Sequence, residues 1–163
     1  MSNKSDYTSE EWQLLLDVPP AVGTAVMYAG RSGVGSVAEA FAMTSGILGA
    51  RNGYEGIELI ESLVSARVND GEKSSIETLS SPYRGLSADE ILKDVVKKCE
   101  RVGKLLRSKA TAKEVSGYTD WAIKLAENVA NAASEGGFLG FGGERVCEDE
   151  EKAIAAVRKA LKG

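Results

Sequence analysis

The chain has 163 residues, of which 43% are hydrophobic and 27% are charged, with a net charge of −4 and no histidine. This length and balance are typical of a single globular domain, residues 1–163, with its own core. The lack of histidine excludes Ser-His-Asp and Cys-His nucleophiles and histidine-ligated metals, and the acidic balance argues against general binding to nucleic acid.

The first helix is predicted from a capping box. Thr8 and Glu11 have the spacing at which each side chain accepts a hydrogen bond from the backbone N–H of the other residue, so a helix begins near Ser9. Residues 1–6 precede it and are expected to be disordered. Pro19-Pro20 removes two backbone donors, and we expect it to break or kink this helix and leave a second segment after it.

The next predicted helix, 34–50, is apolar on nearly all sides. Val37, Phe41 and Leu48 lie on one stripe, and small residues form a second stripe beside it. A helix of this kind is typically buried, so we expect it at the centre of the fold. Glu39 is its only charged residue. Its carboxylate either reaches water at the helix edge or acts as a buried general base.

Four further helices are predicted from apolar stripes at helical spacing and from capping residues, over 53–67, 88–107, 111–134 and 148–161. Residues 68–86 are polar and are interpreted as a long connection. Long alternating runs of apolar and polar residues are absent, so no strand is predicted. The expected fold is all-α: one bundle of five to six helices with helix 34–50 in the middle.

The predicted helix 88–107 is strongly basic, and the first turn of the last helix, Glu148–Glu151, is acidic. The basic residues form either a solvated face or a surface for an acidic partner, such as Glu148–Glu151 of another copy, so a homodimer is a candidate assembly. Cys99 falls on an apolar stripe and is expected in the core. Cys147 stands at a helix start and is expected to be an ordinary thiol.

Location and cofactors are expected from absences in the sequence. The N-terminus lacks the apolar stretch of a signal peptide, and the longest nearly apolar run is far shorter than a membrane span. We therefore expect a cytoplasmic protein that binds neither membranes nor nucleic acid, with free thiols. With no histidine and two cysteines, neither a transition metal nor another cofactor is expected.

The most unusual segment of the chain is a glycine-rich loop that carries two of its three phenylalanines. Its residues are Gly136, Gly137, Phe138, Leu139, Gly140, Phe141, Gly142 and Gly143. Glycine leaves the backbone free, whereas large aromatic side chains favour burial, so the loop should dock on something. Two interpretations stay open: the aromatic side chains plug the core, or they line a ligand pocket or contact a partner.

Two stretches resemble a family of small helical prokaryotic proteins with an EGGFLGFGG-type segment and no established function. They are the C-terminal stretch VANAASEGGFLGFGGERVCEDEE, 129–151, and the opening YTSEEW, 7–12. The family tends to have serine where this chain has Cys147. The resemblance implies an all-helical fold and points to no substrate.

These observations favour a binding role over catalysis. The leading expectation is a non-enzymatic cytoplasmic helical protein that self-associates or binds a protein partner. The alternative is a small-molecule-binding protein whose pocket is gated by the loop 136–143. An enzyme comes third, and no catalytic residue is assigned.

Overall fold

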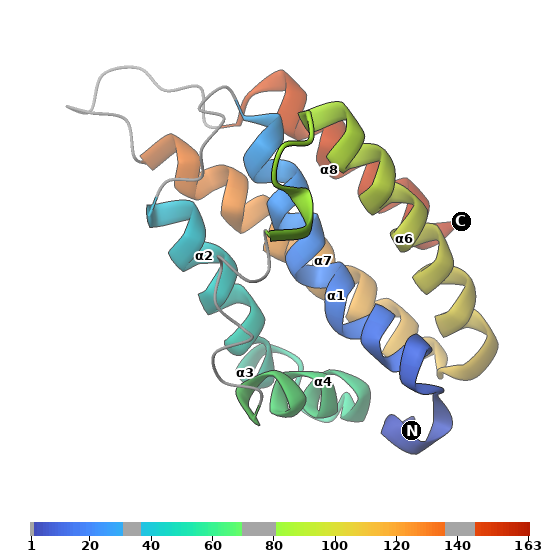
Figure 1. Ribbon diagram of the computed structural model, residues 1–163. Coiled ribbons are helices and arrows are strands. Elements are labelled where there is room, and N and C mark those ends of the chain that lie inside the picture. The colour runs from blue at the N-terminus through green and yellow to red at the C-terminus, as the bar shows by residue number, and fades with distance from the viewer. Residues whose placement is uncertain (1, 31–36, 70–80, 136–145) are drawn as a thin grey trace.

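The structure, a computed structural model, describes residues 2–30, 37–69, 81–135 and 146–163. Within these ranges the regular elements are helices and no strand occurs, which confirms the predicted all-α bundle. The α-helices are α1 (Ser9–Ala29), α2 (Val37–Leu48), α3 (Ala50–Gly53), α4 (Glu58–Asn69), α6 (Ala88–Lys109), α7 (Ala112–Glu135) and α8 (Glu148–Lys162) (Figure 1). The loop 136–143 and most of the predicted connection 68–86 lie outside the described residues.

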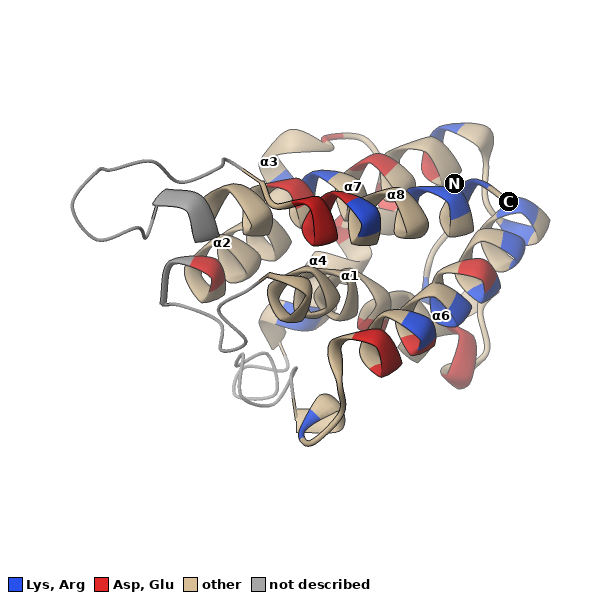
Figure 2. Cartoon of the chain, turned by 90° about the horizontal axis from the view of Figure 1, so that it is seen from above, with Lys and Arg blue, Asp and Glu red and all other residues tan. Residues whose placement is uncertain are grey.

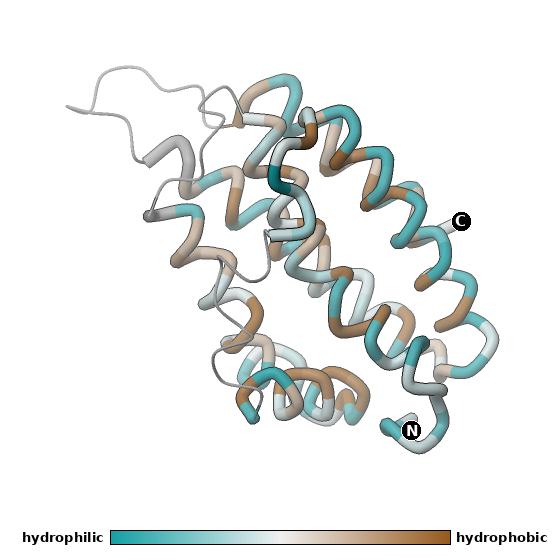
Figure 3. The backbone as a smooth tube through the Cα atoms, viewed as in Figure 1, coloured by the Kyte–Doolittle hydropathy of each residue, from teal (hydrophilic) through white to brown (hydrophobic). Residues whose placement is uncertain are grey.

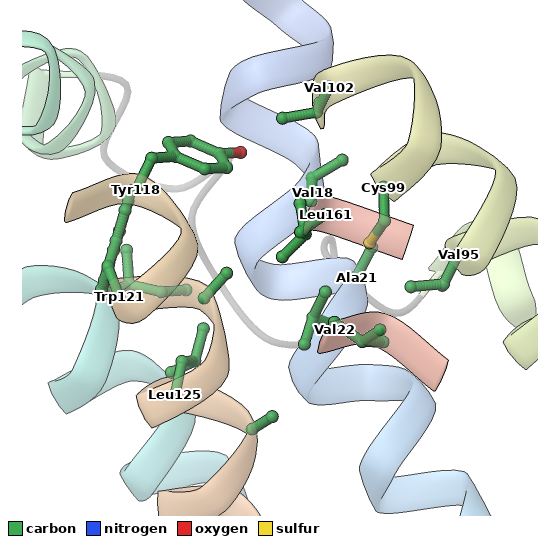
Figure 4. Packing of buried hydrophobic residues seen from close by; sticks show 14 of the residues in the cluster. Val18, Ala21, Val22, Val95, Cys99, Val102, Tyr118, Trp121, Leu125 and Leu161 are labelled. Atoms are coloured by element: carbon green, nitrogen blue, oxygen red, sulfur yellow. The ribbon is translucent and has the colours of Figure 1, made fainter. Parts of the chain in front are cut away.

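The centre of the bundle is α1. It lies between α2 on one side and α6 with α8 on the other, and α7 packs along it (Figure 1). Figure 4 shows Val18, Ala21 and Val22 of α1 among buried side chains of α6, α7 and α8. The expectation that helix 34–50 is central is therefore wrong. That helix, α2, lies at the edge, because α1, α7 and α4 cover one side of it and leave Phe41 on the other side exposed.

The prolines do not end the first helix. Pro19 and Pro20 lie inside α1, which is continuous from Ser9 to Ala29, so of the expected break or kink the break does not occur. Each proline removes the N–H that would bond to the carbonyl four residues earlier, which leaves the carbonyls of Leu15 and Leu16 without an intrahelical donor. Other helices supply the missing donors: the Tyr118 hydroxyl bonds to the Leu15 carbonyl at 2.8 Å, and Arg67 Nη2 bonds to the Leu16 carbonyl at 2.8 Å.

The capping boxes form as the sequence predicts. At the start of α1 the Thr8 N–H donates to Glu11 Oε2 at 2.8 Å, and the Glu11 N–H donates to Thr8 Oγ1 at 3.2 Å. The same exchange begins α6 at Ser87 and α7 at Thr111. At α8 the Cys147 N–H donates to Glu150 Oε2 at 2.8 Å.

The N-terminal residues are held by contacts. Lys4–Asp6 form a short 3-10 helix, and the Ser2 N–H donates to Glu114 Oε1 at 2.7 Å. Ser2 is buried, and its hydroxyl accepts a hydrogen bond from Tyr7. Residues 2–6 are therefore ordered, whereas disorder was expected over 1–6. The reason is that Glu114 Oε2 caps its own helix at Thr111, while Glu114 Oε1 accepts the hydrogen bond from Ser2.

α2, α3 and α4 form the other side of the bundle, against α7 (Figure 1). The predicted helix 53–67 begins later than expected: α4 starts at Glu58, and Gly53 is the last residue of α3. The turn between them contains Gly56 at φ 71°, a left-handed conformation that glycine adopts without strain. The glycines of this segment, Gly53 and Gly56, are turn signals that the sequence prediction placed inside the helix instead.

α6 and α8 pack closely on the opposite side. A Cβ added at Gly103 of α6 would lie 2.6 Å from the backbone carbonyl oxygen of Leu161, so the lack of a side chain permits this approach. α6 turns its apolar residues inward and its hydrophilic residues outward (Figure 3). This contact sets the last turn of α8 beside the end of α6 and the start of α7, where a groove opens.

Candidate functional site

The groove lies where the end of α6, the first half of α7 and the end of α8 meet, and its volume is about 580 Å³. One face of α7 forms its floor, because its lining residues recur at helical spacing. The lining residues are Arg107 and Ala110 from the end of α6, Ala112, Val115, Ser116, Thr119, Asp120 and Ile123 from α7, and Arg158, Leu161 and Lys162 from α8. A pocket of this volume is in the range that small-molecule sites occupy.

Two arginines line the groove, and Glu127 partly balances the charge of Arg158 through an ion pair. Arg107 Nη1 donates to the backbone carbonyls of Leu161 at 3.0 Å and Lys162 at 3.1 Å, which caps the end of α8. Arg158 Nη2 donates to Glu127 Oε1 at 2.8 Å. A guanidinium carries five N–H groups in a planar fork, so both arginines are fixed in place and keep donors for an anion.

The acidic residue of the groove, Asp120, is already engaged. It accepts a hydrogen bond from the Tyr54 hydroxyl at 2.8 Å and pairs with Lys124 at 3.0 Å. Burial alone would raise the pKa of Asp120, but these two hydrogen bonds and the nearby Lys124 and Arg158 charges lower it. Burial and then the bond to Asp120 raise the pKa of Tyr54 well above its ordinary value. Asp120 is therefore a carboxylate held by two donors at the groove wall.

Thr119 is the least expected residue of the groove floor. The residue is only 8% exposed, and its hydroxyl oxygen is not among the buried side-chain atoms that lack a hydrogen-bond partner, although no hydrogen bond is found for it among the described residues. The hydroxyl therefore faces the solvent in the groove. Thr119 therefore presents an unused donor and acceptor among the apolar side chains of Val115 and Ile123.

The groove thus offers three kinds of contact to one molecule. Val115, Ile123 and Leu161 supply an apolar floor, Arg107 and Arg158 supply charged donors, and Thr119 supplies a hydroxyl. Together they suit a ligand with an anionic head and an apolar body, because guanidinium groups pair with carboxylates and phosphates in two-pronged geometry.

The residues singled out in the sequence do not meet in this groove. The loop Gly136–Gly143 lies outside the described residues, so its role stays a prediction. Glu39 is buried on the inner side of α2. Cys99 is buried between α1 and α6, and its burial raises the pKa of the thiol to about 12, as expected of a core residue rather than a nucleophile (Figure 4). Cys147 is half-buried at the start of α8.

The charged surfaces considered for dimerisation are present on α6 and α8 (Figure 2). Lys93, Lys97, Arg101 and Lys104 are exposed on α6, and the described residues include no ion-pair partner for any of them. On α8, Lys152 pairs within its own helix with Glu148 at 3.0 Å and Asp149 at 3.5 Å. A pairing of these two surfaces between copies stays a prediction.

The groove could not be predicted from the sequence, because its residues come from three segments that are far apart in the chain. A signal was available on α7: Val115, Thr119 and Ile123 recur every four residues beside the main core stripe, and Ile123 is buried apart from the main core cluster. In the sequence Arg107 is one residue of a basic helix, and Arg158 lies in no motif. Nothing in the sequence places either arginine beside Thr119.

Comparisons with known proteins found no match among protein-family models, curated proteins or solved structures. In the part of the chain that the structure describes, no helix combines the length and the apolar character needed to cross a membrane. Over the same residues, no cluster of three or more acidic or cysteine side chains could hold a metal ion.

Proposed function

We propose that this protein is a non-enzymatic, cytoplasmic ligand-binding protein whose α6–α7–α8 groove takes a small anionic molecule with an apolar body. The observation that carries the proposal is that Arg107, Arg158 and Thr119 line one groove together with the apolar side chains of α7 and α8. The sequence also suggested a small-molecule-binding protein, but with a pocket gated by the loop 136–143. The groove proposed here is lined on α7 by residues within 112–123, in the first half of that helix. The loop 136–143 follows Glu135, the last residue of the same helix.

The head group of the ligand follows from the donors. The whole chain carries a net charge of −4, so an anion is drawn by local donors rather than by the overall field. Arg158 is held by Glu127 through one nitrogen, which leaves its remaining N–H groups for a carboxylate or phosphate oxygen. A carboxylate is the simplest probe of this chemistry.

The body of the ligand follows from the floor. Each buried CH₂ group contributes about 0.8 kcal/mol, so a chain of about six carbons would contribute roughly 5 kcal/mol before the cost of association. Because the groove is an open surface feature, we expect dissociation constants between about 1 µM and about 1 mM for such a ligand. Neither the head nor the tail alone should suffice.

The test uses octanoate as the probe, with octanol and acetate as the uncharged and tail-less comparisons, measured by isothermal titration calorimetry. Octanoate should bind at one site, and both comparisons should bind at least about tenfold more weakly, since each lacks one set of contacts. Arg158→Gln should weaken octanoate binding by about tenfold or more. Arg101→Gln is the matched control, because Arg101 is an exposed arginine of α6 outside the groove.

A second variant separates binding from folding. Thr119→Val replaces the hydroxyl by a methyl group, and because no hydrogen bond to the hydroxyl is found among the described residues, the protein should stay folded with little change in thermal stability. Its octanoate affinity should fall by roughly two- to tenfold if the hydroxyl bonds to the ligand. Equal binding of octanoate and octanol, or unchanged affinity in both Arg158→Gln and Thr119→Val, would contradict the proposed function.

A further inference from the structure

A second surface lies on the edge helix α2, which carries exposed apolar side chains in the part of the chain that the structure describes. Phe41 is 73% exposed and Leu48 is 41% exposed, and Ser45 lies exposed between them. The three residues follow the spacing i, i+4, i+7 and therefore form one stripe along α2. An exposed phenylalanine on a rigid helix, with a second apolar residue two turns away, is typical of a contact surface.

The stripe borders a hollow between α2 and α7 with a volume of about 480 Å³. The hollow is lined by Phe41, Ala42, Ser45 and Gly46 on α2 and by Asn128, Asn131 and Ala132 on α7. The two helices are held in fixed register, because Trp121 Nε1 donates to the Gly46 carbonyl at 3.1 Å and the Leu125 side chain fills the space where a Cβ of Gly46 would lie. The exposed side chain of Phe41 thus lies at the edge of this hollow.

Charge narrows the choice of partner. The residues that line the hollow are all uncharged, and Glu39, the only charged residue of α2, is buried. In a chain that is 27% charged, such a face offers no complement to a basic or acidic partner. A second copy of the chain is different, because it brings the same uncharged face and adds no like-charge repulsion at the contact.

The spacing of the stripe also suits a two-fold axis. When two α2 helices lie antiparallel and cross near Ser45, Phe41 of one copy faces Leu48 of the other, and the same pair forms again by symmetry. Ser45 at the crossing is small enough for close approach of the two helices. We propose that two copies of this protein associate through α2, with each Phe41 set against Leu48 and the hollow of the other copy. This proposal does not depend on the groove.

The contact is short, since α2 has 12 residues, so the dimer should be weak, with a dissociation constant on the order of 10–100 µM. The effect of salt distinguishes this α2 dimer from the ionic dimer suggested by the sequence, in which the basic face of α6 contacts the acidic first turn of α8 in another copy. An ionic contact weakens between about 0.05 M and about 1 M salt, whereas an uncharged apolar contact does not.

Sedimentation equilibrium over about 5–500 µM protein, at both salt concentrations, tests the proposal. The unmodified protein should dimerise equally at both, and Phe41→Asp should weaken the dimer by at least about tenfold. Val68→Asp is the matched control: Val68 is 60% exposed on α4 and does not line the hollow beside the α2 stripe, so this change should leave the dimer intact. Circular dichroism checks that both variants are folded. A monomer throughout, a dimer lost at high salt, or a dimer unaffected by Phe41→Asp would overturn the proposal.

Discussion

Two side chains from other helices replace the hydrogen bonds that Pro19 and Pro20 cannot make. The Tyr118 hydroxyl is fully buried and donates to the Leu15 carbonyl, while Arg67, also buried, donates to the Leu16 carbonyl. Both carbonyls lie inside the protein, where water is a poor substitute. The docking of α7 and α4 against α1 therefore supplies the two donors that the prolines lack.

Removing the Tyr118 hydroxyl should expose this dependence. Tyr118→Phe keeps the ring but leaves the Leu15 carbonyl unsatisfied, so the free energy of unfolding should fall by about 1–3 kcal/mol. In the Pro19→Ala variant, the backbone N–H of Ala at position 19 can bond to the Leu15 carbonyl. Tyr118→Phe should therefore lower the free energy of unfolding clearly less in that variant than in the unmodified protein. Urea denaturation of the four proteins of this cycle measures the difference. An equal cost in both backgrounds would show that the hydroxyl acts in another way.

At the scale of elements, most helix starts could be predicted because their signals are local. The capping boxes at Thr8, Ser87 and Thr111 each depend on residues three apart in the chain, and all three form. The continuity of α1 could not be predicted, since the groups that support its prolines come from α4 and α7. The rule that proline breaks or kinks a helix considers only the local backbone, and it does not include hydrogen-bond donors from other helices.

Glu114 joins two elements and gives the protein a pH dependence. Burial alone would raise its pKa, but hydrogen bonds from the Ser2 and Thr111 backbone and from the Thr111 hydroxyl outweigh burial and lower the pKa from 4.5 to about 2. Because the pKa is lower in the folded state, this carboxylate stabilises the fold above about pH 4.5, and the contribution is lost as the pH falls toward 2.

Glu114→Gln should therefore destabilise the protein at neutral pH by at most about 3 kcal/mol, and the difference from the unmodified protein should shrink between pH 4.5 and pH 2. Glu90→Gln is the control, because Glu90 occupies the same position in the α6 capping box but is exposed and bonds only within its own turn. Its effect should be smaller. Chemical denaturation across this pH range makes the comparison, and a constant difference at all pH values would count against the assignment.

At the scale of the whole molecule, the sequence predicted the fold class but not which helix lies at its centre. α1 and α2 are both rich in apolar residues, and apolar character on all sides of a helix fits burial in the core and burial in an interface equally well. The choice depends on how many helices dock on each, which no local pattern records. The groove was missed for the same reason: Arg107, Thr119 and Arg158 become neighbours only once α6, α7 and α8 are packed.

The central claim is that the α6–α7–α8 groove binds an amphipathic anion, and amide chemical shifts measured by two-dimensional NMR during an octanoate titration test it most directly. Saturable shifts should be largest in 115–123 and 158–162, which line the groove, and small along α2. Thr119→Val should reduce them at matched octanoate concentration. Shifts that are largest in 136–143 would place the ligand at the glycine-phenylalanine loop instead, and that result, or the absence of any saturable change in the groove, would contradict the account.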